Sequence, residues 1–319
     1  MVVMDRRERL EGAGFHALAA TAAALWWWWL ICAPEARGSF LGSRLATSAP
    51  FLLVGPDALA LVLGGAWLAV AFARRRPELP ALAWTHFGAA GYAWALSAYC
   101  ALDDPAAYWG LVGMSALVTP SFVFAMRASG VSLLWGPFRF RPWDAPDTAG
   151  LRRATRRQTA LMWLVFFGLL PVALTRIEAS AGWTEHWNER PWVHWLGALL
   201  FFAGAILAIL ASREMVRLGM GTPLPATCAS RLVQSGPYAW IRNPMATGSL
   251  GQGVGVAMWL GSPLVGVYML AGITAWEVLV RHEEEAWLEA RFDEAYASYR
   301  QRVPCWFPRL GRRPEARPV

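Results

Sequence analysis

The sequence contains no lysine, so all 29 of its Lys and Arg positions are arginines. Charged residues make up only 16% of the 319 residues, whereas hydrophobic residues make up 56%. In an average soluble domain about 25% of the residues are charged. The scarcity of charge therefore argues against an ordinary soluble domain, and the long uncharged runs predict a membrane protein.

Cysteine is also scarce, and Cys32, Cys100, Cys228 and Cys305 lie far apart in the sequence. Zinc sites and disulfide frameworks need closely or regularly spaced cysteines, and no Cys-x-x-Cys pair occurs. We therefore expect no metal site. The arginines fall in short segments between apolar runs, so the topology of a membrane protein explains them better than a nucleic-acid partner, and we expect none.

The apolar runs predict an all-α fold, a polytopic membrane helical bundle with about eight transmembrane helices. Asp57, in Gly55-Pro56-Asp57, is expected to cap the start of the second helix. Gly251 and Gly255 are four residues apart in the seventh run, a spacing that indicates close helix packing and leaves open a ligand beside the helix. The predicted spans are 17–33, 51–73, 81–102, 108–126, 159–175, 193–211, 245–260 and 263–280.

Arginine placement predicts the orientation of these spans. If the N-terminus is cytoplasmic, only Arg37, Arg44, Arg176 and Arg190 of the 29 arginines fall outside. Positive residues accumulate on the cytoplasmic side, so we expect both termini to be cytoplasmic. A basic loop before Gln158 suggests an N-terminal four-span membrane module of unknown role at 1–157. The second module, 158–319, contains every candidate motif. The basic loop between the two modules has the composition of a segment that lies on lipid headgroups.

Two polar motifs flank the last pair of apolar runs. Gly236-Pro237-Tyr238 and Arg242-Asn243-Pro244 precede the pair, and their Gly-Pro and Asn-Pro steps predict a structured loop that enters a helix. Free N–H groups at that helix start, together with Arg242, favour an anion. Glu283-Glu284-Glu285 follows the pair, where carboxylates favour a cationic ligand. From spacing alone, an ordinary loop and a solvated helix start remain open alternatives.

Taken in order, these residues resemble the isoprenylcysteine carboxyl methyltransferase and phospholipid methyltransferase family of integral-membrane enzymes. The resemblance runs from about Arg213 to Leu310, and Gly219-x-Gly221-Thr222-Pro223 is similar to bacterial members. Asn243 stands where the family often has histidine, and Ala246 stands where an aromatic residue is usual. The motifs that carry the resemblance are Leu232-Val233-x-Ser235-Gly236-Pro237-Tyr238, Arg242-Asn243-Pro244-Met245, Glu284-Glu285-x-x-Leu288-x-x-x-Phe292-x-x-x-Tyr296-x-x-Tyr299 and Val303-Pro304.

The resemblance implies S-adenosylmethionine as the cofactor, held at the cytoplasmic face of a bacterial inner (plasma) membrane. Arg242, Asn243 and Glu284 are implied as catalytic residues, and whether a general base exists is left open. The implied acceptor is a lipid-like or small hydrophobic molecule from the bilayer that offers a carboxylate, amine or thiol. A transporter or sensor that uses the same cavity is the alternative, and the oligomeric state is left open. The implied cofactor-binding residues are Val233, Gly236, Pro237, Tyr238, Arg242, Asn243, Pro244, Glu284 and Glu285.

Overall fold

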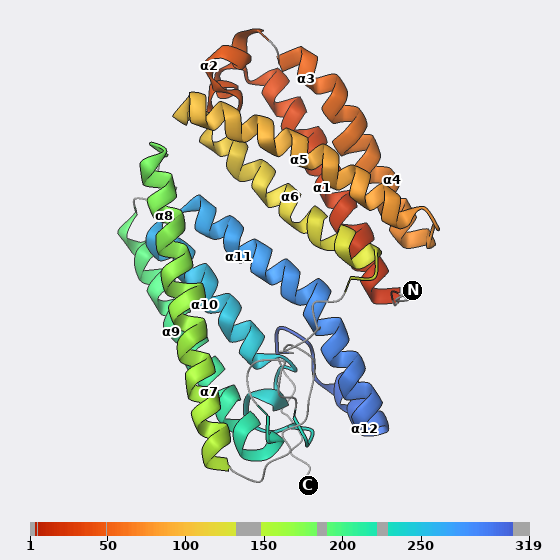
Figure 1. The fold of residues 1–319 in the computed structure, drawn as a ribbon, viewed down its shortest axis with the longest axis vertical. Helices are drawn as coiled ribbons and strands as arrows, with labels where there is room; N and C mark the ends of the chain where they lie inside the picture. Colours follow the sequence, from red (N-terminus) through yellow and green to blue (C-terminus); the bar gives the residue numbers. More distant parts are fainter. Residues whose placement is uncertain are drawn as a thin grey trace. The chain divides into compact units, whose positions relative to one another are not determined.

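The computed structural model is all-helical in the part of the chain that it describes, and no strand occurs there (Figure 1). The chain divides into two compact units. Unit 1 comprises Met1–Ser132, Ile177–Glu185 and Leu270–Leu279, and unit 2 comprises Leu133–Arg176, His186–Met269 and Val280–Val319. The predicted boundary at 157/158 stays a prediction. The described residues are 4, 6–48, 50–131, 148–183, 190–221 and 229–308.

In unit 1, helix α1 (Arg6–Cys32) packs closely against helix α4 (Gly64–Arg74). Side-chain contact is tight at Gly12, where an added Cβ would lie 2.5 Å from the Phe72 ring, and at Gly65, where it would lie 3.2 Å from Ala20 Cβ. A buried ion pair between Arg127 and Glu8 joins α6 to α1. The helices of this unit are α1 (Arg6–Cys32), α2 (Gly38–Ser48), α3 (Pro50–Asp57), α4 (Gly64–Arg74), α5 (Leu79–Asp103) and α6 (Tyr108–Ala128).

Asp57 does not cap a helix start, so that prediction is wrong. The helix already begins at Pro50 and continues through Asp57, whose φ of −69° and ψ of −38° are helical, into the π-helical segment Ala58–Leu63. The Asp57 carboxylate instead accepts a hydrogen bond from Trp27 Nε1 at 3.1 Å. An indole partner across the helix pair thus satisfies the carboxylate, and no backbone N–H is needed.

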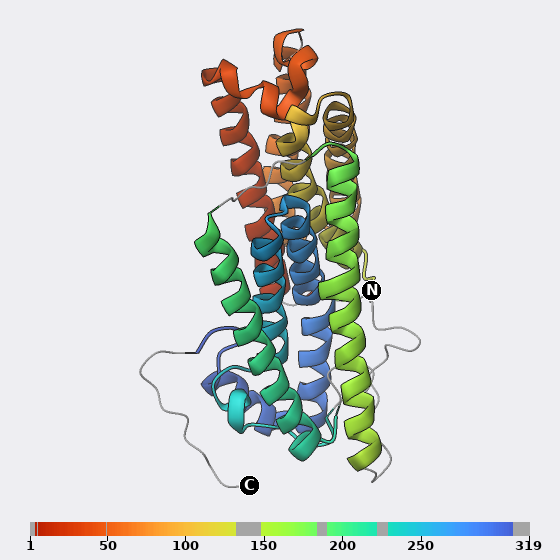
Figure 2. The same cartoon turned by 90° about the vertical axis from the view of Figure 1, so that its left-hand side faces the viewer.

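Unit 2 contains the polar motifs and most of the helices next to them. Helices α7 and α8 are joined by the π-helical Trp163–Leu169 into one continuous helix, which is green in Figure 2. The last residues of α8 and of α11 are assigned to unit 1. The helices are α7 (Thr148–Met162), α8 (Leu170–Ser180), α9 (Pro191–Glu214), α10 (Pro244–Leu260), α11 (Pro263–Ala275) and α12 (His282–Arg302).

Helices α9 and α10 pack backbone against backbone through paired glycines. A Cβ on Gly248 would lie 2.6 Å from Gly204 O, and a Cβ on Gly255 would lie 2.5 Å from Gly197 O. Gly255 is therefore at a close approach, as its sequence position predicts. Gly251 is not, because a Cβ there would meet Leu200 O at 3.6 Å, an ordinary contact distance. The close-packed residues are seven apart, which is two helical turns.

A two-residue turn reverses the chain between α10 and α11. Gly261 adopts the left-handed region with φ 60°, and the Ser262 hydroxyl accepts a hydrogen bond from Val265 N at 3.1 Å. Glycine enters this region without the penalty that a side chain pays. The turn makes α10 and α11 antiparallel, so the segment before α10 and the segment after α11 return to the same end of the hairpin. The apolar stretch ends at Val280, and the charged residues from Arg281 onward lie outside the predicted span.

Six helices of the described chain are long and apolar enough to cross a membrane. The two other predicted spans are present as α5 and α10, but α10 has only 17 residues, which corresponds to about 26 Å against a hydrocarbon core of about 30 Å. The all-α, polytopic membrane fold is thus confirmed. The count of eight spans and the cytoplasmic position of both termini stay predictions.

Candidate functional site

The loop before α10 is fixed by a glycine in a conformation that other residues disfavour. Gly236 has φ 58° and opens the 3-10 helix Gly236–Ala239. An added Cβ there would lie 2.8 Å from Cγ of Glu214, at the end of α9. The Glu214 carboxylate accepts hydrogen bonds from Ser235 Oγ at 3.1 Å and from Arg217 Nη2 at 3.0 Å. The loop therefore rests directly on the end of α9.

The charged helix after α11 is bent, and the bend returns its second half to the first. Asp293 has φ 42° and ψ −120°, outside the helical region. The turn brings Arg300 Nε to 3.9 Å from Glu285 Oε2 and Arg300 Nη1 to 3.3 Å from Glu289 Oε2. In a straight helix Glu285 and Arg300, fifteen positions apart, would be separated by about 22 Å along the axis.

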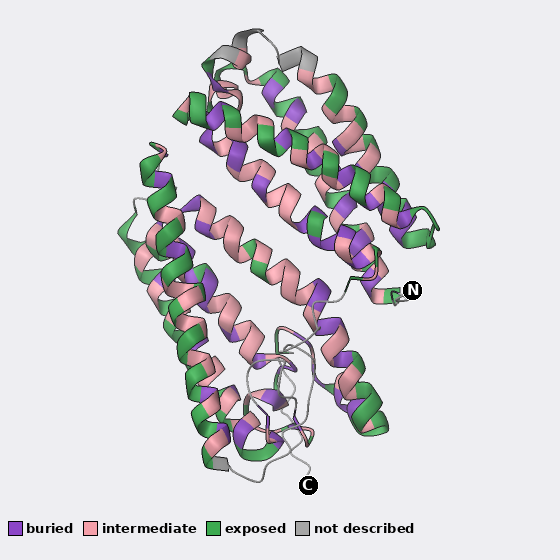
Figure 3. Ribbon diagram, in the orientation of Figure 1, coloured by how far each residue is buried: buried purple, intermediate pink, exposed green. Residues whose placement is uncertain are grey.

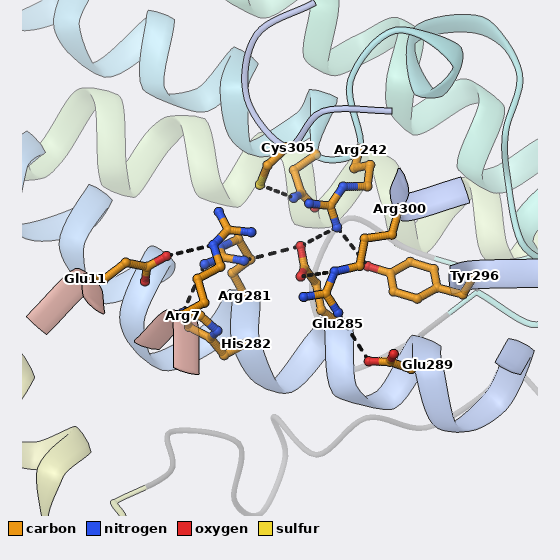
Figure 4. Close-up of polar contacts among 11 residues, drawn as sticks. Arg7, Glu11, Arg242, Arg281, His282, Glu285, Glu289, Tyr296, Arg300 and Cys305 are labelled. Carbon is orange, nitrogen blue, oxygen red and sulfur yellow. Dashed lines mark hydrogen bonds and ion pairs between the residues drawn. The ribbon is translucent and has the colours of Figure 1, made fainter. Parts of the chain in front are cut away.

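Glu285 is the centre of a buried charged cluster (Figure 4). Its Oε1 lies 2.8 Å from Arg242 Nη1 and 3.3 Å from Arg281 Nη1. Arg242 Nη1 also donates a hydrogen bond to Tyr296 OH at 3.3 Å. Arg242 and Glu285 come from the two motifs on either side of the hairpin, so this ion pair joins them.

The chain after α12 runs alongside the Arg242-Asn243 segment. Arg242 N donates to Pro304 O at 2.9 Å, and Asn243 N donates to Cys305 O at 3.4 Å. The Asn243 side-chain Nδ2 lies 3.2 Å from Cys305 Sγ. Burial raises the pKa of the Cys305 thiol, so the neutral thiol is favoured there. Pro244 is the first residue of α10.

Tyr238 and Val233 form a hydrophobic cluster with Ala211 of α9. The Tyr238 carbonyl accepts a hydrogen bond from Tyr299 OH at 2.7 Å. The Tyr238 hydroxyl and Arg242 Nε are both buried and have no hydrogen-bond partner within the described residues. Both are donors of this loop that no described residue uses.

Glu284 lies next to the charged cluster but outside its ion pairs. It is partly buried, and none of the arginines in the described ranges forms an ion pair with it. Burial, together with the negative charge of Glu285, raises its pKa from 4.5 to about 7. A cation placed beside Glu284 would offset both effects.

The structure brings all nine predicted site residues into unit 2, with direct contact between Arg242 and Glu285. Three further residues take part that were not predicted as site residues from the sequence. Glu214 supports the loop, Arg281 shares Glu285, and Cys305 holds Asn243. Arg281 had a sequence signal, because it lies four residues before Glu285 on a helix. The Thr222-Pro223 part of the upstream motif lies outside the described residues.

Fold and site together define a polytopic helical membrane protein with a buried charged cluster at one end of a helical hairpin. Residues 192–295 match the sequence model of the phospholipid methyltransferase family, and this segment contains every predicted site residue. This match confirms the resemblance of this segment to the isoprenylcysteine carboxyl methyltransferase and phospholipid methyltransferase family that the motifs predict.

Among curated proteins, the chain is similar to protein-S-isoprenylcysteine O-methyltransferases. The rat protein is 29% identical over 148 residues, which are 41% of this chain and 50% of that protein. The human protein is 37% identical over 79 residues, which are 24% of this chain and 27% of that protein. The chain thus spans about half the length or less of the curated relatives it matches. No solved structure matches.

Proposed function

We propose that this protein is an integral-membrane methyltransferase that uses S-adenosylmethionine and methylates a lipid-like or small hydrophobic acceptor. The observation that carries the proposal is the buried Arg242–Glu285 ion pair, which joins the two motifs. It lies beside Glu284, which forms no ion pair with any described arginine. The family match and the methyltransferase names of the relatives support it. In the proposed orientation the cofactor enters from the cytoplasm and the acceptor enters from the bilayer. A bacterial inner membrane is part of this proposal.

The chemistry of the available groups fits this cofactor. S-adenosylmethionine carries a sulfonium, an ammonium and a carboxylate, and when bound it supplies an activated methyl group. Glu284 offers a negative charge to the cationic groups. Arg242 Nε and the Tyr238 hydroxyl offer donors for the carboxylate or for hydroxyl groups. Gly236 allows the backbone to approach where a side chain would not fit.

The chain's own contribution to such a reaction is positioning and the exclusion of water. Methyl transfer from a sulfonium needs an in-line approach of the acceptor, so placement of the two molecules dominates the rate. Glu285 holds Arg242, and the tail through Cys305 holds Asn243, so both motif residues are fixed before a ligand arrives. A carboxylate or thiolate acceptor needs no base, whereas an amine must first lose a proton.

Glu284→Gln is expected to weaken the binding of S-adenosylmethionine at pH 8 by at least about tenfold, because a charge-assisted contact contributes about 1.5–3 kcal/mol. Isothermal titration calorimetry of the purified protein in detergent measures the effect. Glu289→Gln is the matched control: Glu289 lies on the same helix, and its side chain is 52% exposed. If both variants bind like the parent, the assignment of Glu284 is wrong. If the folded parent protein does not bind the cofactor at all, the transporter or sensor alternative gains support.

The raised pKa of Glu284 predicts a pH dependence of the same binding. Below pH 7 the carboxyl is protonated in the free protein and must lose its proton to meet a cation. Affinity should therefore fall by up to about tenfold for each pH unit below 7 and level off above it. The stability of the ligand-free protein should change with pH in the opposite direction. As the pH rises from 4.5 to about 7, Glu284 ionises at an unfavourable position and the free energy of unfolding falls. Binding titrations between pH 5.5 and 8.5 test the predicted change in affinity. The same titrations of the Glu284→Gln variant give a reference curve, and subtracting it removes the contribution of the cofactor's own ionisable groups. An unchanged slope in that variant would contradict the prediction.

A further inference from the structure

Helix α7 presents four exposed arginines that the proposed catalytic site does not use. Arg152, Arg153, Arg156 and Arg157 all face outward, whereas Leu151 is fully buried on the opposite side. Figure 3 shows the largely exposed surface of α7 and of its continuation in α8. The pattern divides the helix into one face that packs against the protein and one that carries positive charge.

Within the described residues, no carboxylate neutralises the charge on this face. The sequence of α7 contains no Asp or Glu, and none of the four arginines forms an ion pair with a described carboxylate. Arginines elsewhere in the chain do have such partners: Arg217 pairs with Glu214, and Arg242 pairs with Glu285. The like charges on α7 are also spaced four residues apart, an arrangement that disfavours the helix unless anions are present.

The position of the arginines along the helix indicates where those anions come from. The helix continues without interruption from Ala149 to Ser180 and is apolar enough to cross a membrane. The four arginines extend over about 7.5 Å just before its apolar part, and one headgroup layer of a bilayer is about 5–8 Å thick. We propose that this arginine face is a binding site for acidic phospholipids, whose phosphate groups pair with the guanidinium groups.

The test compares lipids that differ only in headgroup charge. The full chain in a neutral detergent is titrated with phosphatidylglycerol or with phosphatidylcholine of the same acyl chains, and bound lipid is counted by native mass spectrometry. The parent should prefer phosphatidylglycerol, and added salt should reduce the preference. Replacing all four arginines with glutamine should lower the affinity for phosphatidylglycerol by at least about tenfold. Replacing them with lysine should preserve most of it, and cofactor binding should not change.

The control removes charge elsewhere: Arg74, Arg75 and Arg76 are exposed residues at the end of α4, and all three become glutamine. An equal loss of lipid binding in this control would overturn the proposal, because it would show attraction to net charge alone. Unchanged lipid binding in the α7 glutamine variant would also overturn the proposal. The same holds if α7 binds a single-stranded oligonucleotide in preference to lipid. Should the fourfold variant fail to fold, the double variant R152Q/R156Q is expected to lose part of the affinity, and full retention would count against the site.

Discussion

Glu285→Gln is expected to lower the free energy of unfolding by about 3–5 kcal/mol, the cost of removing one partner from a buried ion pair. The carboxylate lies within 3.3 Å of Arg242 and Arg281, and both guanidinium groups are buried. Glutamine retains the shape but not the charge, so two buried positive groups would face each other without this counter-charge. Thermal unfolding in detergent, followed by tryptophan fluorescence, measures the loss.

Glu289→Gln provides the comparison for this change. Glu289 lies one turn further along α12 and pairs with Arg300, whose side chain is 34% exposed. A pair of this kind contributes about 0–1 kcal/mol, so the control should unfold close to the parent. Equal unfolding temperatures for the two variants would show that the Glu285 cluster does not hold the two motifs together. Loss of cofactor binding in Glu285→Gln alone would show that the cluster also positions Arg242.

Gly248→Ala is expected to destabilise the protein by about 1–3 kcal/mol, as overpacking does in a close-packed interior. The added methyl would lie 2.6 Å from Gly204 O and 3.0 Å from Ala208 N, both backbone atoms of α9. Neither atom moves unless the whole helix moves, so α10 must shift away from α9. Because α10 begins at Pro244, directly after Arg242 and Asn243, the shift should also weaken cofactor binding.

Gly251→Ala is the matched control on the same helix. Its methyl would meet Leu200 O at 3.6 Å and Gly204 Cα at 3.7 Å, which are ordinary contacts. Alanine also favours a helix over glycine by about 1 kcal/mol, so this variant should match or exceed the parent in stability. If both alanine variants shift the unfolding temperature equally, helix propensity and not the close approach governs this interface.

The tail of the site shows where prediction from the sequence reaches its limit. The resemblance implied cofactor binding by both Glu284 and Glu285 and a catalytic role for Glu284 alone, but it did not indicate which of them pairs with arginine. The structure separates them, because Glu285 is paired with arginines while Glu284 lies outside those pairs. The difference depends on the loop that places Arg242 beside Glu285, and the turn at Asp293 then brings Arg300 near the same carboxylate. Local propensity is a weak guide where tertiary contacts decide the path of the chain.

The sequence by itself determined the membrane class, the helical fold and the identity of the polar motifs. These follow from the length of uncharged runs and from residue types that have strong local preferences, such as glycine and proline in turns. Tertiary structure alone decided which polar groups meet: Arg242 with Glu285, forty-three positions apart, and the Asn243 amide with the Cys305 thiol. The physical reason is that ion pairing and close packing depend on distances in space, which a hairpin turn and a bent helix set and which sequence separation does not.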